Sequence, residues 1–410
     1  MNNLIDELDR ARHELVEITK TLVRIPSETP PSDTGDVANA VSEYLSGLEN
    51  VTTSLHSSKL PVQNLVAVTK GSGPGKRLVL NGHLDTYPAG DHAAWTDEPF
   101  SGVEREGKIF GRGSADMKGG IACALVAFKC LARNPKLWSG ELVLALAGDE
   151  ESMGLLGTQF LLDTVPLARG DAMLCADVGS PLVPRIGEKG MIWIDVHAVG
   201  KPAHGAHVHR GLNAIDELRA AMDALSGLSE FSVETPSDVA SVIASAKSIS
   251  EPLGGEGEAD VLQRITVNFG RLSGGVSANL VADRAVLNAD IRLPMGIGVA
   301  EVEAEITRLL APMTNITFEI VRRYEPTWTS PADPIVGAVK SACREVLGQE
   351  PVVNMRVGGS DARLYRAAGI PTVVCGLTPH NLGGPDEFVE IEEMVTVAKI
   401  QARTALNFLC

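Results

Sequence analysis

The stretch LVLNGHLD, from Leu78 to Asp85, is an apolar run that ends in a histidine and an aspartate two positions apart. In a β-strand such residues share a face, so His83 and Asp85 are predicted side by side at the carboxyl end of a strand. Open α/β sheets bind ligands at that end. A carboxylate beside a neutral imidazole suits a metal-binding histidine and its orienting partner, while a histidine that caps a strand is the alternative. The stretch therefore predicts an α/β fold with a candidate metal site.

Carboxylates follow two further apolar runs. The run ELVLALA leads into Asp149, Glu150 and Glu151, and the run AMLCA leads into Asp177. Buried carboxylates are costly unless cations or protons compensate them, although a solvated loop of acids is the alternative. Neighbouring residues in an extended chain point to different sides. Glu150 and Glu151 are therefore expected to differ in purpose, one as a metal ligand and the other as a base that faces the substrate.

Asp116 lies in the glycine-rich segment GRGSADMKGG, residues 111–120. Glycines let the backbone turn sharply and present this carboxylate from a fixed position, although a helix N-cap is the alternative. Gly111 and Gly113 imitate a dinucleotide-binding fingerprint, but Asp116 stands where the third glycine is required. This departure weighs against an oxidoreductase.

Composition excludes other classes of protein. The formal net charge of −16 argues against a nucleic-acid-binding surface, which needs clustered Lys and Arg. The 6 cysteines include no CxxC pair and are expected to be reduced core residues. The first 25 residues follow an amphipathic pattern, so neither a signal peptide nor a membrane anchor is expected. We therefore expect a cytoplasmic protein.

Five motifs occur in order over nearly the whole chain: GHLDT, GRGSADMKGG, GDEESMG, CADVGS and LTPHNLGGPDEFV. Together they resemble the zinc-dependent amidohydrolase and exopeptidase family of acetylornithine deacetylase, succinyl-diaminopimelate desuccinylase, aminoacylase and glutamate carboxypeptidase. The resemblance implies a hydrolase that cleaves the amide bond of a small N-acyl amino acid. A dipeptidase or carboxypeptidase is the alternative within the family, and a non-catalytic binding protein that kept the fold is the alternative outside it.

The resemblance also implies two divalent metal ions, zinc in the first place and cobalt or manganese as alternatives. Asp85 would orient a ligand, and Glu150 would be the general base. The implied ligands are Asp116 on both ions, His83 and Asp177 on one ion, and Glu151 and His380 on the other. Two departures from the family pattern stand out: the spacer NLGGP after His380 is longer than usual, and Asp177 stands where glutamate is common.

The segment from Val183 to Leu293 differs in pattern from what precedes it. Strand patterns such as IWIDVHAVG and VADRAVLNADIRL alternate with the helical RGLNAIDELRAAMDAL, which predicts a small α+β, ferredoxin-like sandwich. By the resemblance this insert, residues 181–293, is a lid and dimerisation domain, so a homodimer is expected. The catalytic domain, with a central mixed or parallel sheet, is then expected in two parts, residues 1–180 and 294–410.

The resemblance implies further residues around the substrate. His204 would reach the partner subunit's active site and stabilise the oxyanion, with help from Asn279, although His204, His207 and His209 could also form a metal-binding tract. Arg292 would hold a substrate carboxylate, because a planar guanidinium can bind both oxygens. Substrate contacts are also expected from Gly358, Gly359, Ser360 and Arg363. An ordinary ion pair is an equal alternative for Arg363.

Overall fold

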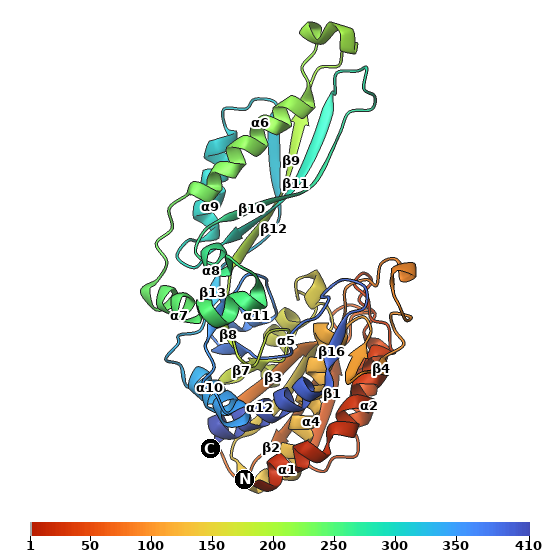
Figure 1. Cartoon of the computed structure of the whole chain (residues 1–410), viewed down its shortest axis with the longest axis vertical. Coiled ribbons are helices and arrows are strands. Elements are labelled where there is room, and N and C mark those ends of the chain that lie inside the picture. Colours follow the sequence, from red (N-terminus) through yellow and green to blue (C-terminus); the bar gives the residue numbers. More distant parts are fainter. Residues whose placement is uncertain (1) are drawn as a thin grey trace. The chain divides into compact units, whose positions relative to one another are not determined.

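The computed structural model describes residues 2–410 and divides into two compact units (Figure 1). Unit 1 consists of Met1–Ile186, Thr329–Asn354 and Ser360–Cys410, and unit 2 consists of Gly187–Trp328 and Met355–Gly359. None of the helices in the described part of the chain is long and apolar enough to span a membrane. All 6 cysteines there are free, and only Cys410 is exposed.

The main sheet of unit 1 is mixed, as predicted. Its strands run in the order β1 (Val51–His56), β2 (Asn64–Lys70), β6 (Glu141–Ala147), β3 (Arg77–His83), β7 (Ala172–Cys175) and β15 (Thr372–Val374). β3 pairs in parallel with β6 and β7, and β15 pairs in parallel with β7. β2 is antiparallel to both of its neighbours. The carboxyl ends of β3, β6 and β7 therefore meet at one edge, which is where the predicted site residues follow.

Helices of unit 1 pack around this sheet. They are α1 (Asn2–Arg10), α2 (Arg12–Val23), α3 (Gly35–Leu45), α4 (Gly119–Arg133), α5 (Thr158–Thr164), α10 (Pro334–Leu347), α11 (Ala362–Ala367) and α12 (Ile391–Leu409). α4 is buried at every position except Lys129 and Arg133 and packs against α12, α2 and β3. At Gly120 a Cβ atom would lie 2.2 Å from the carbonyl oxygen of Ala176. Only glycine therefore lets the start of α4 approach the end of β7 this closely.

A second, small sheet of unit 1 joins distant parts of the sequence. It has the order β16 (Phe388–Glu390), β5 (Lys108–Phe110) and β4 (Val103–Arg105). Phe388 pairs with Phe110, and their rings pack 5.2 Å apart. This pairing brings the segment before Phe388 next to the glycine-rich loop that follows Phe110.

Unit 2 is an antiparallel sheet with helices packed against it. Its strands run in the order β10 (Thr266–Gly274), β11 (Arg284–Leu293), β9 (Gly190–Val199) and β12 (Ile316–Tyr324). Its helices are α6 (Ala214–Ser226), α7 (Ser237–Gly254), α8 (Glu258–Val261) and α9 (Val299–Leu310). Apart from α7 and α8, the order along the chain is βαββαβ, the ferredoxin-like arrangement. Three short strands adjoin the crossings between the units: β8 (Arg185–Glu188), β13 (Thr327–Trp328) and β14 (Asn354–Arg356).

The predicted insert over residues 181–293 ends before α9 and β12, yet both elements belong to unit 2. β12 pairs antiparallel with β9, and the apolar face of α9 joins the core of this unit through Val302 and Ile306. The reason is the topology: a βαββαβ unit needs its last helix and strand to cover and extend the sheet. The amphipathic pattern of these elements alone fits either unit.

Candidate active site

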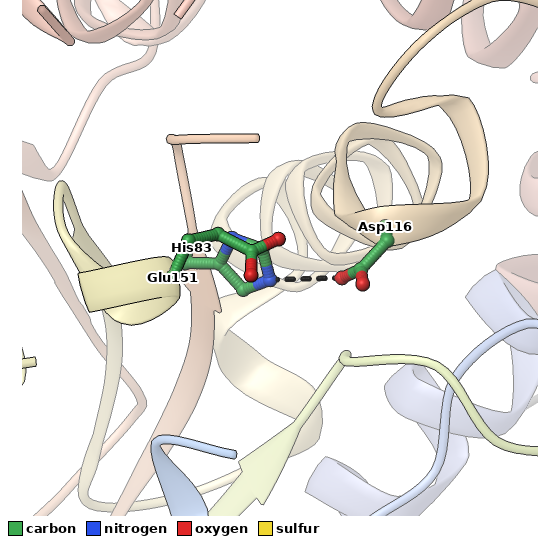
Figure 2. Close-up of side chains that lie close together, drawn as sticks. All are labelled: His83, Asp116 and Glu151. Carbon is green, nitrogen blue, oxygen red and sulfur yellow. Dashed lines mark hydrogen bonds and ion pairs between the residues drawn. The ribbon is translucent and has the colours of Figure 1, made fainter. Parts of the chain in front are cut away.

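His83 ends β3 with a side chain that is only 2% exposed. Its Nδ1 lies 2.9 Å from the backbone carbonyl oxygen of Asp85, and its Nε2 lies 3.0 Å from Oδ1 of Asp116 (Figure 2). A carbonyl oxygen can only accept a hydrogen bond, so Nδ1 carries a proton. In a neutral ring Nε2 is then an acceptor that faces another acceptor. A second proton or a cation is therefore needed at Nε2. Burial lowers the pKa of His83, but the hydrogen bonds to Asp116 and Asp85 outweigh burial, and the pKa is raised well above its usual value.

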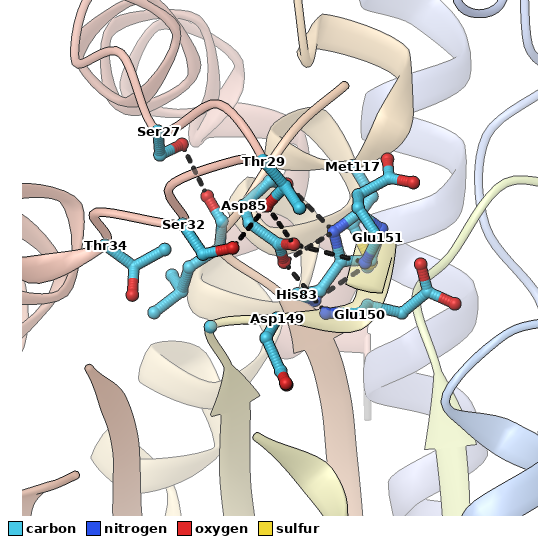
Figure 3. Close-up of polar contacts among 12 residues, drawn as sticks. Ser27, Thr29, Ser32, Thr34, His83, Asp85, Met117, Asp149, Glu150 and Glu151 are labelled. Atoms are coloured by element: carbon cyan, nitrogen blue, oxygen red, sulfur yellow. Dashed lines mark hydrogen bonds and ion pairs between the residues drawn. The ribbon is translucent and has the colours of Figure 1, made fainter. Parts of the chain in front are cut away.

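Asp85 is fully buried and joins three segments of unit 1. Its carboxylate accepts hydrogen bonds from Oγ1 of Thr29 at 2.8 Å and from the backbone N–H groups of Glu150 and Glu151, both at 3.1 Å (Figure 3). Oδ1 of Asp85 also lies 3.5 Å from Nδ1 of His83. This carboxylate therefore fixes the end of β3 relative to the turn that follows β6.

Glu150 and Glu151 start a short 3-10 turn after β6. Glu151 forms one group with His83 and Asp116, whose candidate ligand atoms all lie within 4.8 Å of one another. Burial and the nearby carboxylates of Asp116 and Glu150 raise the pKa of Glu151 to about 10. Among residues 2–410, no group donates a hydrogen bond to its buried Oε1. Nitrogen and oxygen donors this close, with an unsatisfied carboxylate oxygen, fit a divalent metal.

Glu150 is not part of that group. Its side chain is 13% exposed, and burial raises its pKa to about 8 although His83 and Arg363 act in the opposite direction. Arg363 is 5% exposed and lies 3.7 Å from Oε1 of Glu150. Its guanidinium donates to the backbone carbonyl oxygens of Ser360 at 2.6 Å and Met153 at 2.8 Å. The structure thus places Arg363 in the interior, where it supports the turn that carries Glu150.

Asp116 precedes α4 in a loop that turns at Gly113. Gly113 has a φ of +80°, and a Cβ atom there would lie 2.4 Å from Cγ2 of Thr86. The backbone N–H of Asp116 donates to Oε1 of Glu387 at 3.2 Å. The carboxylate of Asp116 is 18% exposed and faces His83.

The other two predicted ligands lie outside the close group. Asp177 follows β7, is 2% exposed and accepts a hydrogen bond from the N–H of Val178 at 2.5 Å. It is close enough to Glu150 to help raise the pKa of that carboxyl. His380 is half-buried and stacks on the ring of Phe388, with centroids 4.4 Å apart.

Three predicted residues lie in unit 2. His204 and Asn279 are neighbours on two exposed loops, where the N–H of Gly205 donates to the carbonyl oxygen of Asn279 at 2.7 Å. Arg292, on β11, makes a bidentate ion pair with Asp290, with Nε–Oδ1 and Nη2–Oδ2 distances of 2.8 and 2.9 Å.

The predicted substrate segment at residues 358–360 crosses between the units. Gly358 and Gly359 are half-buried and belong to unit 2, whereas Ser360 belongs to unit 1. Ser360 is fully buried, and its Oγ accepts a hydrogen bond from the N–H of Ala362.

Thr29, Arg112 and Glu387 are residues of the site that the sequence patterns did not indicate. Arg112 and Glu387 form a buried ion pair across 275 positions of sequence. Both residues lie inside the motifs quoted above. The signal that could have indicated Arg112 is a charged residue within a glycine-rich run. Nothing in one sequence indicates which distant charge is its partner.

Comparison with known proteins identifies the family. The model of the peptidase family M20/M25/M40 matches residues 79–407. The chain belongs to this family. It is 30% identical over 400 residues to succinyl-diaminopimelate desuccinylase of Paracoccus denitrificans, covering 94% of this chain and 96% of the relative. It is 28% identical over 409 residues to the desuccinylase of Methylorubrum extorquens, covering 95% and 98%.

Solved structures of other hydrolases share the fold. A metallo-carboxypeptidase from Sulfolobus solfataricus superposes with a TM-score of 0.81 at 19% identity, covering 97% of this chain and 99% of that one. Human carnosine dipeptidase 1 gives 0.78 at 17% identity, covering 100% and 99%. A dinuclear metal-binding peptidase from Bacillus subtilis gives 0.68 at 15% identity, covering 98% and 99%.

The family predicted from the five motifs is therefore confirmed, as is the α/β class with its α+β companion. This M20 protein is a metal-dependent hydrolase of amide or peptide bonds.

Proposed function

We propose that this M20 hydrolase removes the acyl group from a small N-acyl amino acid with a free carboxylate. The group formed by His83, Asp116 and Glu151, with Glu150 on the same turn, is the observation that carries the proposal. The desuccinylases that align with 94% to 95% of the chain support an acyl group as the part released.

We propose two divalent metal ions, zinc before cobalt or manganese. The M20 peptidase of Bacillus subtilis is described as dinuclear, which supports the number for this chain. When bound, the ions would lower the pKa of water and polarise the scissile carbonyl. The residues proposed to hold them are His83, Asp116, Glu151, Asp177 and His380.

Glu150 is the proposed general base. Its carboxylate would take a proton from the attacking water and pass it to the departing amine, a role that requires a group within hydrogen-bond reach and a pKa near the working pH. Asp85 supports this step indirectly, because it holds the backbone N–H of Glu150 and lies beside the ring of His83.

We also propose roles for residues around the substrate. His204 and Asn279 would stabilise the oxyanion, and Arg292 would hold the substrate carboxylate with Asp290 fixing its guanidinium. Gly358, Gly359 and Ser360 would line the substrate site. A homodimer and a cytoplasmic location are likewise proposed from the sequence alone.

The test is hydrolysis of a panel of N-succinyl, N-acetyl and N-carbamoyl amino acids together with dipeptides. We expect the wild type to cleave an N-acyl amino acid, and Glu150→Gln to lose at least ~100-fold in kcat with its metal content unchanged. Glu141→Gln is the control, because Glu141 begins β6 whereas Glu150 follows its end. Full activity of Glu150→Gln, or cleavage of dipeptides alone, would contradict the proposal.

A further inference from the structure

Arg112 and Glu387 form an ion pair that is almost completely removed from solvent. Their side chains are 2% and 1% exposed, and Nη1 of Arg112 contacts Oε2 of Glu387. A buried ion pair costs desolvation energy that only good geometry and further hydrogen bonds offset. The hydrogen bonds that the other polar atoms of the two residues make therefore show which segments the pair holds in place.

Glu387 holds the loop that carries Asp116 at four points. Its Oε1 accepts hydrogen bonds from the backbone N–H groups of Ala115 at 2.9 Å and Asp116 at 3.2 Å. Its backbone carbonyl oxygen accepts from the N–H of Gly111 at 2.9 Å and from Oγ of Ser114 at 3.2 Å. The position of the Asp116 backbone is thus set by a residue 271 positions further along the chain.

Arg112 holds the segment that follows His380. Its Nη2 donates to the backbone carbonyl oxygens of Gly383 at 2.8 Å and Gly384 at 3.2 Å. Both glycines lie in the spacer NLGGP after His380, and their carbonyl groups accept hydrogen bonds from the same guanidinium that pairs with Glu387. Phe388, the residue after Glu387, stacks on the ring of His380 and pairs with the backbone of His380.

We propose that the pair of Arg112 and Glu387 is a positioning device that fixes the Asp116 loop against the His380 segment and thereby sets the affinity of the site for divalent metal. The proposal rests on the ligand roles proposed above for Asp116 and His380. The pair also gives the spacer after His380 a fixed position, because Arg112 binds two of its carbonyl groups. Residues that support metal ligands typically change metal affinity 10- to 100-fold when mutated.

The test is the zinc affinity of the metal-free protein, measured by competition with a chromogenic chelator, for Glu387→Gln and Arg112→Lys. We expect zinc to bind about 10- to 100-fold more weakly to each variant. The visible spectrum of the cobalt-loaded variants should change as well, because the ligands shift. Should Glu387→Gln fail to fold, Arg112→Lys, which keeps the charge but not the planar fork, decides by the same measurements.

Glu141→Gln is the matched control. It breaks the ion pair of Glu141 with Arg77, which joins the first residues of β6 and β3, at the opposite end of these strands from His83. We expect its zinc affinity to stay within about twofold of the wild type. Wild-type zinc affinity in Glu387→Gln and Arg112→Lys, or an equal loss in Glu141→Gln, would overturn the proposal. Failure of the proposed deacylase activity would instead appear as absent hydrolysis with zinc binding intact.

Discussion

The contacts of Arg363 suggest a role that the sequence did not predict for this single residue. The motif left a substrate contact and an ordinary ion pair as equal alternatives. In the structure the guanidinium lies 3.7 Å from Oε1 of Glu150 and donates to the backbone carbonyl oxygens of Ser360 and Met153. Met153 ends the turn that begins at Glu150. Arg363 therefore fixes the turn that carries the proposed base and keeps a positive charge next to its carboxylate.

Arg363→Lys should lower kcat about 10- to 100-fold and leave KM within about twofold of the wild type. Lysine has one donor nitrogen where Arg363 uses Nη1 for Ser360 and Nη2 for Met153, and small displacements of a catalytic group are costly. Steady-state kinetics on the substrate identified from the panel measure this. Arg366→Lys is the control: Arg366 is also buried in α11 but contacts the carbonyl oxygen of Thr372. A raised KM with unchanged kcat for Arg363→Lys would instead establish a substrate contact.

At the scale of elements, α4, which follows Asp116, packs closely against the end of β7, which precedes Asp177. The approach depends on Gly120, where a Cβ atom would collide with the backbone at Ala176. We expect Gly120→Ala to destabilise the metal-free protein by about 1 to 3 kcal/mol through overpacking. Thermal unfolding followed by circular dichroism measures the change.

Gly337 provides the contrast within another helix. It lies in α10, and nothing is within 4 Å of the position of its Cβ atom. Gly337→Ala should therefore stabilise the protein by about 0.5 to 1 kcal/mol, because alanine restricts the unfolded chain. Equal changes in stability for Gly120→Ala and Gly337→Ala would show that α4 packs less closely on β7 than the distance at Gly120 indicates.

The strand ends were the most predictable part of the site. An apolar run followed by polar residues predicts both a strand and its carboxyl end, which is why His83, Asp85, Asp177 and the carboxylates after β6 could be named from sequence. Asp116 was indicated instead by its glycine-rich segment and by the family resemblance. The support of these residues could not be predicted, because the contacts of Asp85 with Thr29 and of Arg112 with Glu387 join segments far apart in the chain. Sequence periodicity reports burial, and it does not report partners.

At the scale of the whole molecule, one chain folds into an α/β unit and a βαββαβ unit. The group formed by His83, Asp116 and Glu151 belongs to unit 1, as do the residues that support it. The M20 family match and the 30% identity to a desuccinylase cover both units. Binding of the proposed catalytic metal ions is therefore expected to be a property of unit 1. The substrate panel is needed to identify the acyl group that the enzyme removes.

The most direct test of the account is the metal content of the purified protein by elemental analysis, before and after chelation and after zinc is restored. We predict close to two zinc ions per chain, loss of hydrolysis on chelation, and recovery of both on addition of zinc. Asp116→Ala should bind less than one ion, since Asp116 is the ligand proposed for both. Sub-stoichiometric metal that cannot be restored, with no cleavage of any N-acyl amino acid, would contradict the metal centre at His83, Asp116 and Glu151.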